Sequence, residues 1–132
     1  MDVVEIERDF TSLMAQKLNL VVDKQIFRGG VPAGKTGVGI LFDGEIKDKM
    51  IAPRQWNVQI LASFNERDNA MRFVSRVTGL FPCYDQVCNS CVFKSVSLRG
   101  NGTAYRSPDG GKTKWFASIN LFAVVLTTGA QV

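Results

Sequence analysis

The stretch QWNVQILASF, residues 55–64, is the clearest strand in the chain and the point from which the fold can be predicted. Its apolar side chains alternate with largely polar ones, and this period of two is typical of a strand with one covered face. The residues that follow, NERDNAMRFVSRVTG, favour a helix that Asn65 or Ser63 caps and that Gly79 ends. A strand that leads directly into a helix indicates a sheet with helices packed on it.

The flanking sequence supplies the other expected elements. Residues 2–19 predict an amphipathic helix, with apolar residues at helical spacing and Asp2 as its N-cap. In chain order we further expect short strands at residues 25–30 and 38–42, a charged irregular segment at 45–54, a strand at 91–98, a turn at 107–111 and a long final strand at 114–127. The prediction is one α+β domain over residues 1–132, with a mainly antiparallel sheet, two helices packed on one face, and long loops.

Composition limits the possible functions. The 132 residues include no histidine, which excludes histidine-based triads and removes the commonest metal ligand. The net charge of +4 is too small and too scattered to indicate nucleic-acid binding by itself. The N-terminus, MDVVEIERDF, does not resemble a signal peptide, and no apolar run is long enough to span a bilayer. We therefore expect a protein without membrane contact, made in the cytoplasm.

A glycine-rich stretch, GGVPAGKT at residues 29–36, matches the phosphate-binding pattern G-x-x-x-x-G-K-[ST]. That pattern works only where a helix begins at the lysine, because the helix N-terminus binds the phosphates. Here the following residues, GVGILFDG, favour a strand and a turn. We therefore expect a glycine-rich loop between two strands, with Lys35 as a loop lysine and no bound nucleotide.

Three cysteines, Cys83, Cys88 and Cys91, lie close together in PCYDQVCNSC. Their spacing matches part of an iron–sulfur pattern, but the chain has no fourth cysteine for such a cluster. Free thiols are the favoured interpretation. A zinc site completed by Asp85, or a disulfide from Cys83 to Cys88 or Cys91, are the alternatives.

Other short patterns have simpler interpretations. NGT at Asn101 fits the glycosylation pattern but indicates a turn. The carboxylates of Asp43, Glu45 and Asp48 could form an acid–base pair, but neighbouring lysines favour a solvated charged loop. We therefore expect no catalytic, cofactor-binding or metal-binding residue, and no enzymatic activity.

The order of these elements resembles a known group. The strand WNVQILASF leading into the helix ERDNAMRFVSRVTG, and the turn SPDGGKTKW opening the strand FASINLFAVVLT, are similar to the tail terminator (tail completion) and minor capsid proteins of long-tailed bacteriophages. The resemblance implies a structural virion protein of the tail or neck, present in the host cytoplasm during assembly. Such proteins form a hexameric ring that caps the tail tube, ends its polymerisation and joins the tail to the head connector, while DNA passes through the lumen without being read.

The resemblance also implies partners: other copies of the chain, the tail tube protein and the head–tail connector protein. Basic residues in the loops are the expected contacts with them, namely Arg28, Lys35, Lys47, Lys49, Arg54, Arg106, Lys112 and Lys114. A head-completion or connector protein of the same particle is the first alternative. A nucleotide-dependent enzyme and a small nucleic-acid-binding module are the others. The last rests on the net charge of +4 and on four aromatic residues that we expect mostly in the core, Phe27, Trp56, Tyr105 and Trp115.

Overall fold

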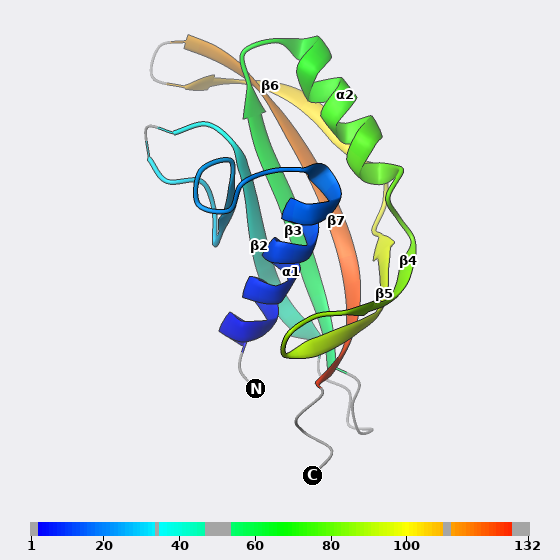
Figure 1. Cartoon of the computed structure of the whole chain (residues 1–132). Helices are drawn as coiled ribbons and strands as arrows, with labels where there is room; N and C mark the ends of the chain where they lie inside the picture. Colours follow the sequence, from blue (N-terminus) through cyan, green and yellow to red (C-terminus); the bar gives the residue numbers. More distant parts are fainter. Residues whose placement is uncertain (1–2, 34, 47–53, 110–111, 128–132) are drawn as a thin grey trace.

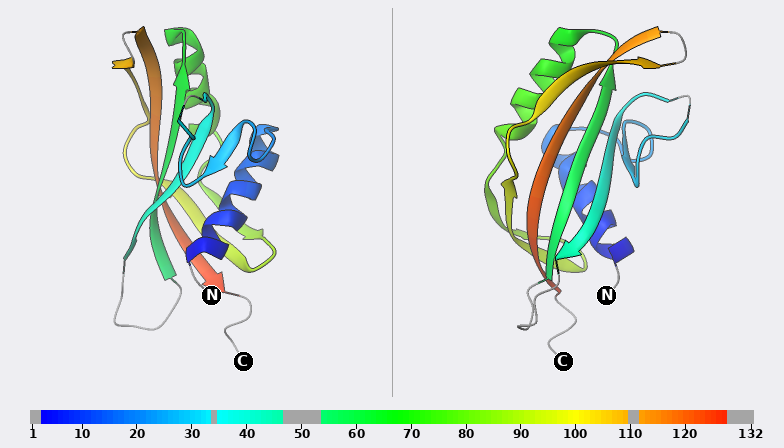
Figure 2. Two further views of the ribbon diagram at one scale, coloured as in Figure 1. Left: turned by 90° about the vertical axis from the view of Figure 1, so that its left-hand side faces the viewer. Right: turned by 180° about the vertical axis from the view of Figure 1, so that it is seen from behind.

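The chain folds as an α+β protein in which two helices accompany a strongly curled sheet (Figures 1 and 2). The computed structural model describes residues 3–33, 35–46, 54–109 and 112–127. The elements, in chain order, are α1 (Val3–Leu18), β1 (Ile26–Arg28), β2 (Val38–Ile46), β3 (Arg54–Phe64), α2 (Arg67–Thr78), β4 (Cys83–Val87), β5 (Cys91–Leu98), β6 (Thr103–Asp109) and β7 (Lys112–Thr127).

The centre of the sheet is the antiparallel pair β3–β7, which runs unbroken from Arg54 opposite Val125 to Phe64 opposite Trp115. The strand order is β1-β2-β3-β7-β5-β4. The other side of β7 is divided, because β5 pairs with its second half and β6 with its first half. The strand at 55–64 predicted from its alternation is therefore confirmed, and so is the long final strand.

The sheet is mixed, where the sequence predicts a mainly antiparallel one, because β1 pairs with β2 in parallel. The glycine-rich loop explains this difference. Gly29 and Gly30 have φ values of 80° and 115°, which glycine adopts readily, and they turn the chain away from the sheet after β1. The chain then returns to the starting end of β1, since the amide of Val38 donates to the carbonyl of Gln25 over 2.9 Å.

The core lies against one face of β3 and β7. The side chains of that face are buried, and they are Trp56, Val58, Ile60 and Ala62 in β3 and Ala117, Ile119, Leu121, Ala123 and Val125 in β7. The helix α1 adds Ile6, Phe10 and Met14, all fully buried. The Phe10 ring meets Phe42 of β2 and Phe93 of β5 edge-on, with centroids 5.7 and 5.3 Å apart. Both apolar faces predicted from alternation are the faces that the core covers.

The first helix was predicted correctly to within a residue at each end, and Asn19, with φ of 56°, ends it in the left-handed conformation. Its expected N-cap, Asp2, lies outside the described residues. The second helix begins later than predicted. Glu66 is its N-cap and makes no side-chain capping bond, so the capping roles predicted for Asn65 and Ser63 are wrong.

The buried stripe predicted for α2 is confirmed in part. Ala70 and Val77 are buried, whereas Phe73 and Val74 are only half-buried. The Phe73 ring lies 5.4 Å from the ring of Phe64, at the end of β3. Fewer side chains are therefore buried in this helix than in α1.

Two strand segments differ from the prediction. β2 runs to Ile46 and β3 starts at Arg54, so the ends of the segment 45–54, predicted as irregular, belong to the sheet. The other is β4, which was not predicted and which forms a hairpin with β5 in the region of the three cysteines. Its side chains are exposed or half-buried throughout, so its sequence shows no apolar face.

Candidate functional site

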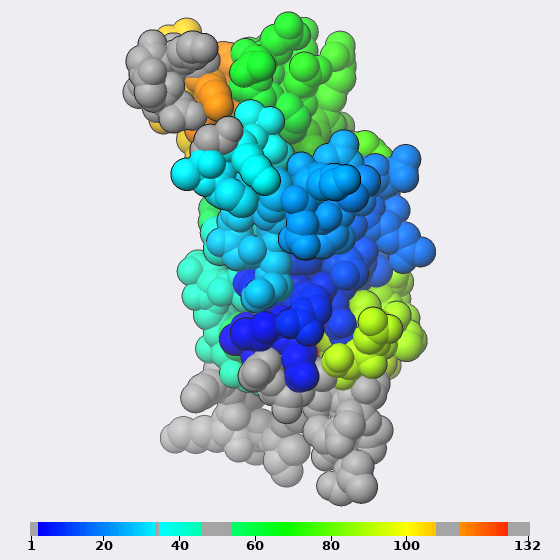
Figure 3. Space-filling model, turned by 60° about the vertical axis from the view of Figure 1, so that its left-hand side comes forward, coloured from blue at the N-terminus to red at the C-terminus, as the bar shows by residue number. Residues whose placement is uncertain are grey.

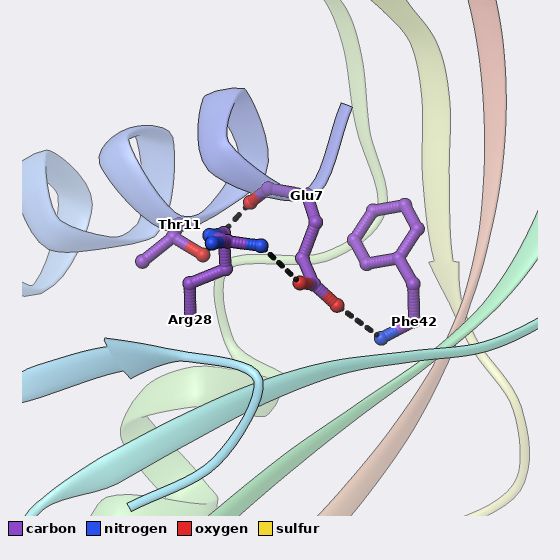
Figure 4. A network of polar contacts seen from close by, with 4 residues as sticks. All are labelled: Glu7, Thr11, Arg28 and Phe42. Atoms are coloured by element: carbon purple, nitrogen blue, oxygen red, sulfur yellow. Dashed lines mark hydrogen bonds and ion pairs between the residues drawn. The ribbon is translucent and has the colours of Figure 1, made fainter. Parts of the chain in front are cut away.

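Arg28, a predicted contact residue, lies against α1 instead of a partner. Its guanidinium is 3.3 Å from Oε1 of Glu7, while Oε2 of Glu7 accepts a hydrogen bond of 3.0 Å from the amide of Phe42 (Figure 4). The backbone carbonyl of Glu7 in turn accepts a hydrogen bond of 2.8 Å from the hydroxyl of Thr11. Glu7 therefore ties α1 to β1 and β2, and Arg28 serves the fold.

Arg54 has a similar internal role. It makes two hydrogen bonds to the carboxylate of Glu45, of 2.8 and 3.1 Å, across the β2–β3 pair. Its guanidinium also lies 5.2 Å from the centre of the Trp56 ring. These contacts explain why the charged segment begins and ends in the sheet, and they make Arg54 a weaker candidate for contact with a partner.

Lys35 and Lys114, two of the predicted contact residues, are brought together. Both line a groove of about 400 Å³ between the glycine-rich loop and the sheet. Leu41, Leu61 and Phe116, from β2, β3 and β7, form its apolar floor. In the space-filling view the loop after β1 lies beside the start of β7 (Figure 3). The loop sits close on the sheet, since a Cβ added to Gly39 would be 3.0 Å from Cα of Gly30.

The glycine-rich loop joins β1 to β2, as the sequence predicts. The strand β2 begins at Val38, where a phosphate-binding loop of the matched pattern requires a helix. The Nζ atom of Lys35 lies 5.8 Å from the centre of the Phe27 ring. The loop therefore differs in geometry from the phosphate loop whose pattern it matches.

The other predicted contact residues lie at the ends of the molecule or outside the described residues. Arg106 is exposed in β6, opposite Trp115 in β7. Lys112 begins β7, but its side chain is outside the described part, as are Lys47 and Lys49. Among the side chains of this set that the structure describes, Lys35 and Lys114 are the two that share one cavity.

The four aromatic residues expected mostly in the core have different environments. Phe27 and Trp56 are buried, and Trp115 is half-buried with the guanidinium of Arg67 5.9 Å from its ring centre. Tyr105 is 41% exposed, so it is the exception. Its ring stacks on Phe116, with centroids 5.6 Å apart and planes inclined by 22°. This pair was missed because it depends on the register between β6 and β7.

A second cavity, of about 430 Å³, is polar and was not predicted. It is lined by Asp43, Asn57, Val58, Arg99, Gly100, Asn120 and Leu121. The guanidinium of Arg99 donates a hydrogen bond to Oδ1 of Asn57. The backbone amide of Arg99 donates another, of 2.8 Å, to the carbonyl of Asn120. The sequence signal for this cavity was the polar side chains that alternate with the apolar ones in the two central strands.

The three carboxylates considered as an acid–base pair are not brought together. Asp43 is exposed, Glu45 is paired with Arg54, and Asp48 lies outside the described residues, so no acid–base pair is seen among them in the described part.

The three cysteines are free thiols, as the favoured interpretation predicts. The amide of Cys88 donates to the carbonyl of Cys91 over 2.8 Å and closes the β4–β5 hairpin. Burial, and then the charge of Asp9, raise the pKa of Cys88 to about 11, and the same two causes raise the pKa of Cys91 further. These thiols are therefore protonated and weakly nucleophilic at neutral pH.

The carboxylate near these thiols is Asp9 of α1, which the sequence analysis missed. It is only 6% exposed and accepts a hydrogen bond of 2.8 Å from the amide of Ser90. The alternative that used Asp85 as a zinc ligand is wrong, because Asp85 is exposed and forms an ion pair of 2.6 Å with Lys94. Within the described residues no group of three or more cysteine or acidic side chains is arranged to hold a metal ion.

The remaining observations concern the surface and the relatives of the chain. Asn101 is exposed between β5 and β6, outside both strands, as expected for a turn. Neither helix of the described part has the length and apolar character needed to cross a membrane. The chain matches no protein-family model. It also matches no curated protein.

Proposed function

We propose that this chain is a ring-forming structural protein of a long-tailed bacteriophage, with six copies in the ring. In this proposal the ring caps the tail tube, ends its polymerisation and joins the tail to the head connector. The proposal starts from the resemblance of the sequence to tail terminator proteins. The observation that carries it in the structure is the part of the sheet face opposite the core that lies outside the groove under the glycine-rich loop and that the described part of the chain leaves uncovered.

Both helices, in this proposal, cover the same face of the sheet. A Cβ added to Gly102 would be 2.8 Å from Cγ1 of Val74 in α2 and 3.2 Å from Cγ1 of Ile119 in β7. Since Ile119 belongs to the buried face, this proximity supports a position of α2 on the core side of the sheet. Phe10 of α1 packs on Phe93 in the same buried cluster, which supports the same position for α1.

The opposite face is mixed in character. Its side chains alternate with the buried ones along β3 and β7 and are half-buried or exposed. Outside the groove under the glycine-rich loop they are Asn57 and Gln59 in β3 and Ser118, Asn120, Phe122, Val124 and Leu126 in β7. A face that joins apolar and polar side chains in this way suits contact with another protein.

A closed ring requires each subunit to present two different surfaces to its neighbours. The uncovered sheet face supplies one of them. The second, in this proposal, includes the loops and the β6–β7 hairpin, with Lys35, Arg106, Lys112 and Lys114. Charges of this kind favour correct partners and register more than affinity. Arg28 and Arg54 have lower priority, because each is already bonded to a carboxylate of its own chain.

The first test is the assembly state of the purified protein. Sedimentation and negative-stain imaging over a range of concentrations should show rings at high concentration, or on isolated tail tubes. A protein that stays monomeric in both conditions contradicts the proposal. In particles assembled without the protein, tails of irregular length are expected, and tails of normal length joined to heads would contradict it.

The same deletion separates the proposed role from its closest alternative, a head-completion or connector protein. Loss of such a protein leaves tails of normal length, because the tail tube still receives its own terminator. The heads then fail to attach to those tails. Tail length, measured apart from attachment, therefore distinguishes the two roles.

A further inference from the structure

The groove between the glycine-rich loop and the sheet has the features of a nucleic-acid site. We propose that it binds single-stranded nucleic acid, with one base stacked on Phe116 and the adjacent phosphates held by Lys35 and Lys114. The proposal does not depend on the ring described above. It rests on the shape of the groove, on a stacked aromatic pair and on the charge of the lining.

The aromatic pair sets the direction in which a base can enter. Tyr105 and Phe116 lie opposite each other in β6 and β7, with nearly parallel rings 5.6 Å apart. Tyr105 thus covers one side of the Phe116 ring. Phe116 also lines the groove, so the side that Tyr105 leaves free is available there. A base in the groove continues the stack, and aromatic stacking of this kind accepts any base.

The charge of the lining fits a phosphodiester. The lining residues are Gly30, Val31, Pro32, Ala33, Lys35, Gly39, Leu41, Leu61, Ala62, Ser63, Lys114 and Phe116. Two of these described residues are cations and none is a carboxylate. The apolar floor of Leu41 and Leu61 accepts the flat surface of a base, and the two lysines of the lining supply positive charge for its phosphates. The volume of about 400 Å³ lies within the range of small-ligand pockets.

A strand fits this site better than a free nucleotide. A nucleotide triphosphate needs a concentrated phosphate cradle, and here a strand begins where the helix of that cradle is required. Tyr105, which stacks on Phe116 beside the groove, is exposed. Its ring extends the aromatic surface beyond a single nucleotide, as in proteins that bind single strands through aromatic platforms.

The test is the fluorescence anisotropy of a labelled twelve-residue oligothymidylate titrated with the purified protein. Saturable, salt-sensitive binding is expected. Phe116→Leu, which keeps an apolar side chain but removes the ring, should weaken it by about tenfold or more. Lys35→Ala should weaken binding and lower the slope of log K against log salt by about 0.7. The melting temperature of each variant verifies that it is folded.

Matched controls separate the groove from general charge and aromatic content. Phe122→Leu removes a ring from the uncovered face of β7 outside the groove, and Lys24→Ala removes an exposed charge away from it. Both should bind like the unchanged protein. Equal losses in control and groove variants overturn the proposal, as does the absence of oligothymidylate binding.

Competition tests the kind of ligand. Unlabelled oligothymidylate should displace the probe, whereas ATP, GTP, a duplex of equal length and an oligoglutamate peptide should not do so at matched concentrations. Displacement by ATP or GTP would indicate that the groove binds a free nucleotide and not a single strand. Displacement by oligoglutamate would show a site for acidic protein segments instead, and either result overturns the proposal.

Discussion

The carboxylate of Asp9, on the first helix, accepts a contact of 3.5 Å from Sγ of Cys91, 82 residues further along the chain. This carboxylate is almost enclosed, and its charge helps to hold both hairpin thiols in the protonated form. The pair connects the start of the chain to the β4–β5 hairpin. It is therefore a sensitive site at which to test the packing of α1.

Replacing Asp9 with asparagine should increase the reactivity of Cys88. The change removes a negative charge that disfavours the thiolate, so the pKa of Cys88 should fall from about 11 towards its ordinary value. The rate of alkylation by iodoacetamide at pH 8.5 should rise, as followed by mass spectrometry. Asp85→Asn is the control, because that carboxylate is exposed and paired with Lys94. An unchanged rate in the Asp9 variant would contradict the assigned cause.

The stability of the protein should decrease at high pH. The pKa of Cys88 is near 9.0 when unfolded and about 11 in the fold, so the unfolded state loses its proton first. The contribution is present in full below pH 9 and is lost as pH rises from 9 through 11. Urea unfolding with a reducing agent should show this loss. A Cys88→Ala, Cys91→Ala variant should show a smaller decrease over the same range; an identical decrease would exclude the thiols as its source.

Removing the side chain of Glu7 should destabilise the protein by about 1–3 kcal/mol, because the amide of Phe42 and the guanidinium of Arg28 both lose their acceptor. Urea unfolding of Glu7→Ala measures the change. The control is Glu66→Ala, since Glu66 is exposed and its side chain makes no capping bond. That variant should stay within about 0.5 kcal/mol of the unchanged protein. Equal effects of the two changes would contradict the role given to Glu7.

The two helices should differ in how much their aromatic residues contribute to stability. Phe10 is fully buried and contacts two other rings, so Phe10→Ala should cost about 3–5 kcal/mol. Phe73 is half-buried, so Phe73→Ala should cost clearly less, about 2 kcal/mol. Chemical unfolding of both variants decides the order. A larger loss for Phe73 would mean that α2 is packed more tightly than its exposure indicates.

Reversing the charge of the β6–β7 hairpin should impair assembly without unfolding the chain. Arg106→Glu combined with Lys112→Glu alters one exposed side chain in β6 and the first residue of β7. Ring formation and tail length should then be affected, while the melting temperature changes little. The control is the double variant Arg28→Glu, Lys24→Glu, which reverses two positive charges in another part of the chain. It should instead lower the stability of the protein, because Arg28→Glu removes the ion pair with Glu7. Normal tails with the hairpin variant would contradict the role proposed for this end of the molecule.

Strong local periodicity determined which elements the sequence could predict. The alternation at residues 55–64 and the helical spacing at 2–19 are local signals, and both elements are present with nearly the expected bounds. The strand β4 has no such signal, because none of its side chains is fully buried and no apolar face alternates with a polar one. The parallel pairing of β1 was also hidden, since it depends on the path of the glycine-rich loop.

The candidate sites were less predictable than the fold, because each joins residues distant in the sequence. Lys35 and Lys114 share a groove only because the loop lies over the sheet near the start of β7. Tyr105 and Phe116 stack only through the register of β6 with β7. Conversely, the lysine and glycines of residues 29–36 suggested a phosphate loop, and the strand that follows them explains why that pattern is misleading here.

The position of β7 in the sheet has a consequence for the synthesis of the protein. β3, β5 and β6 all pair with β7, yet the ribosome makes all three before it. Until Thr127 has left the exit tunnel, the apolar side chains of β3 and β5 lack the strand that joins them into one core. Until β7 has emerged, the nascent chain therefore exposes unpaired strand edges, the condition in which growing chains aggregate or require chaperones.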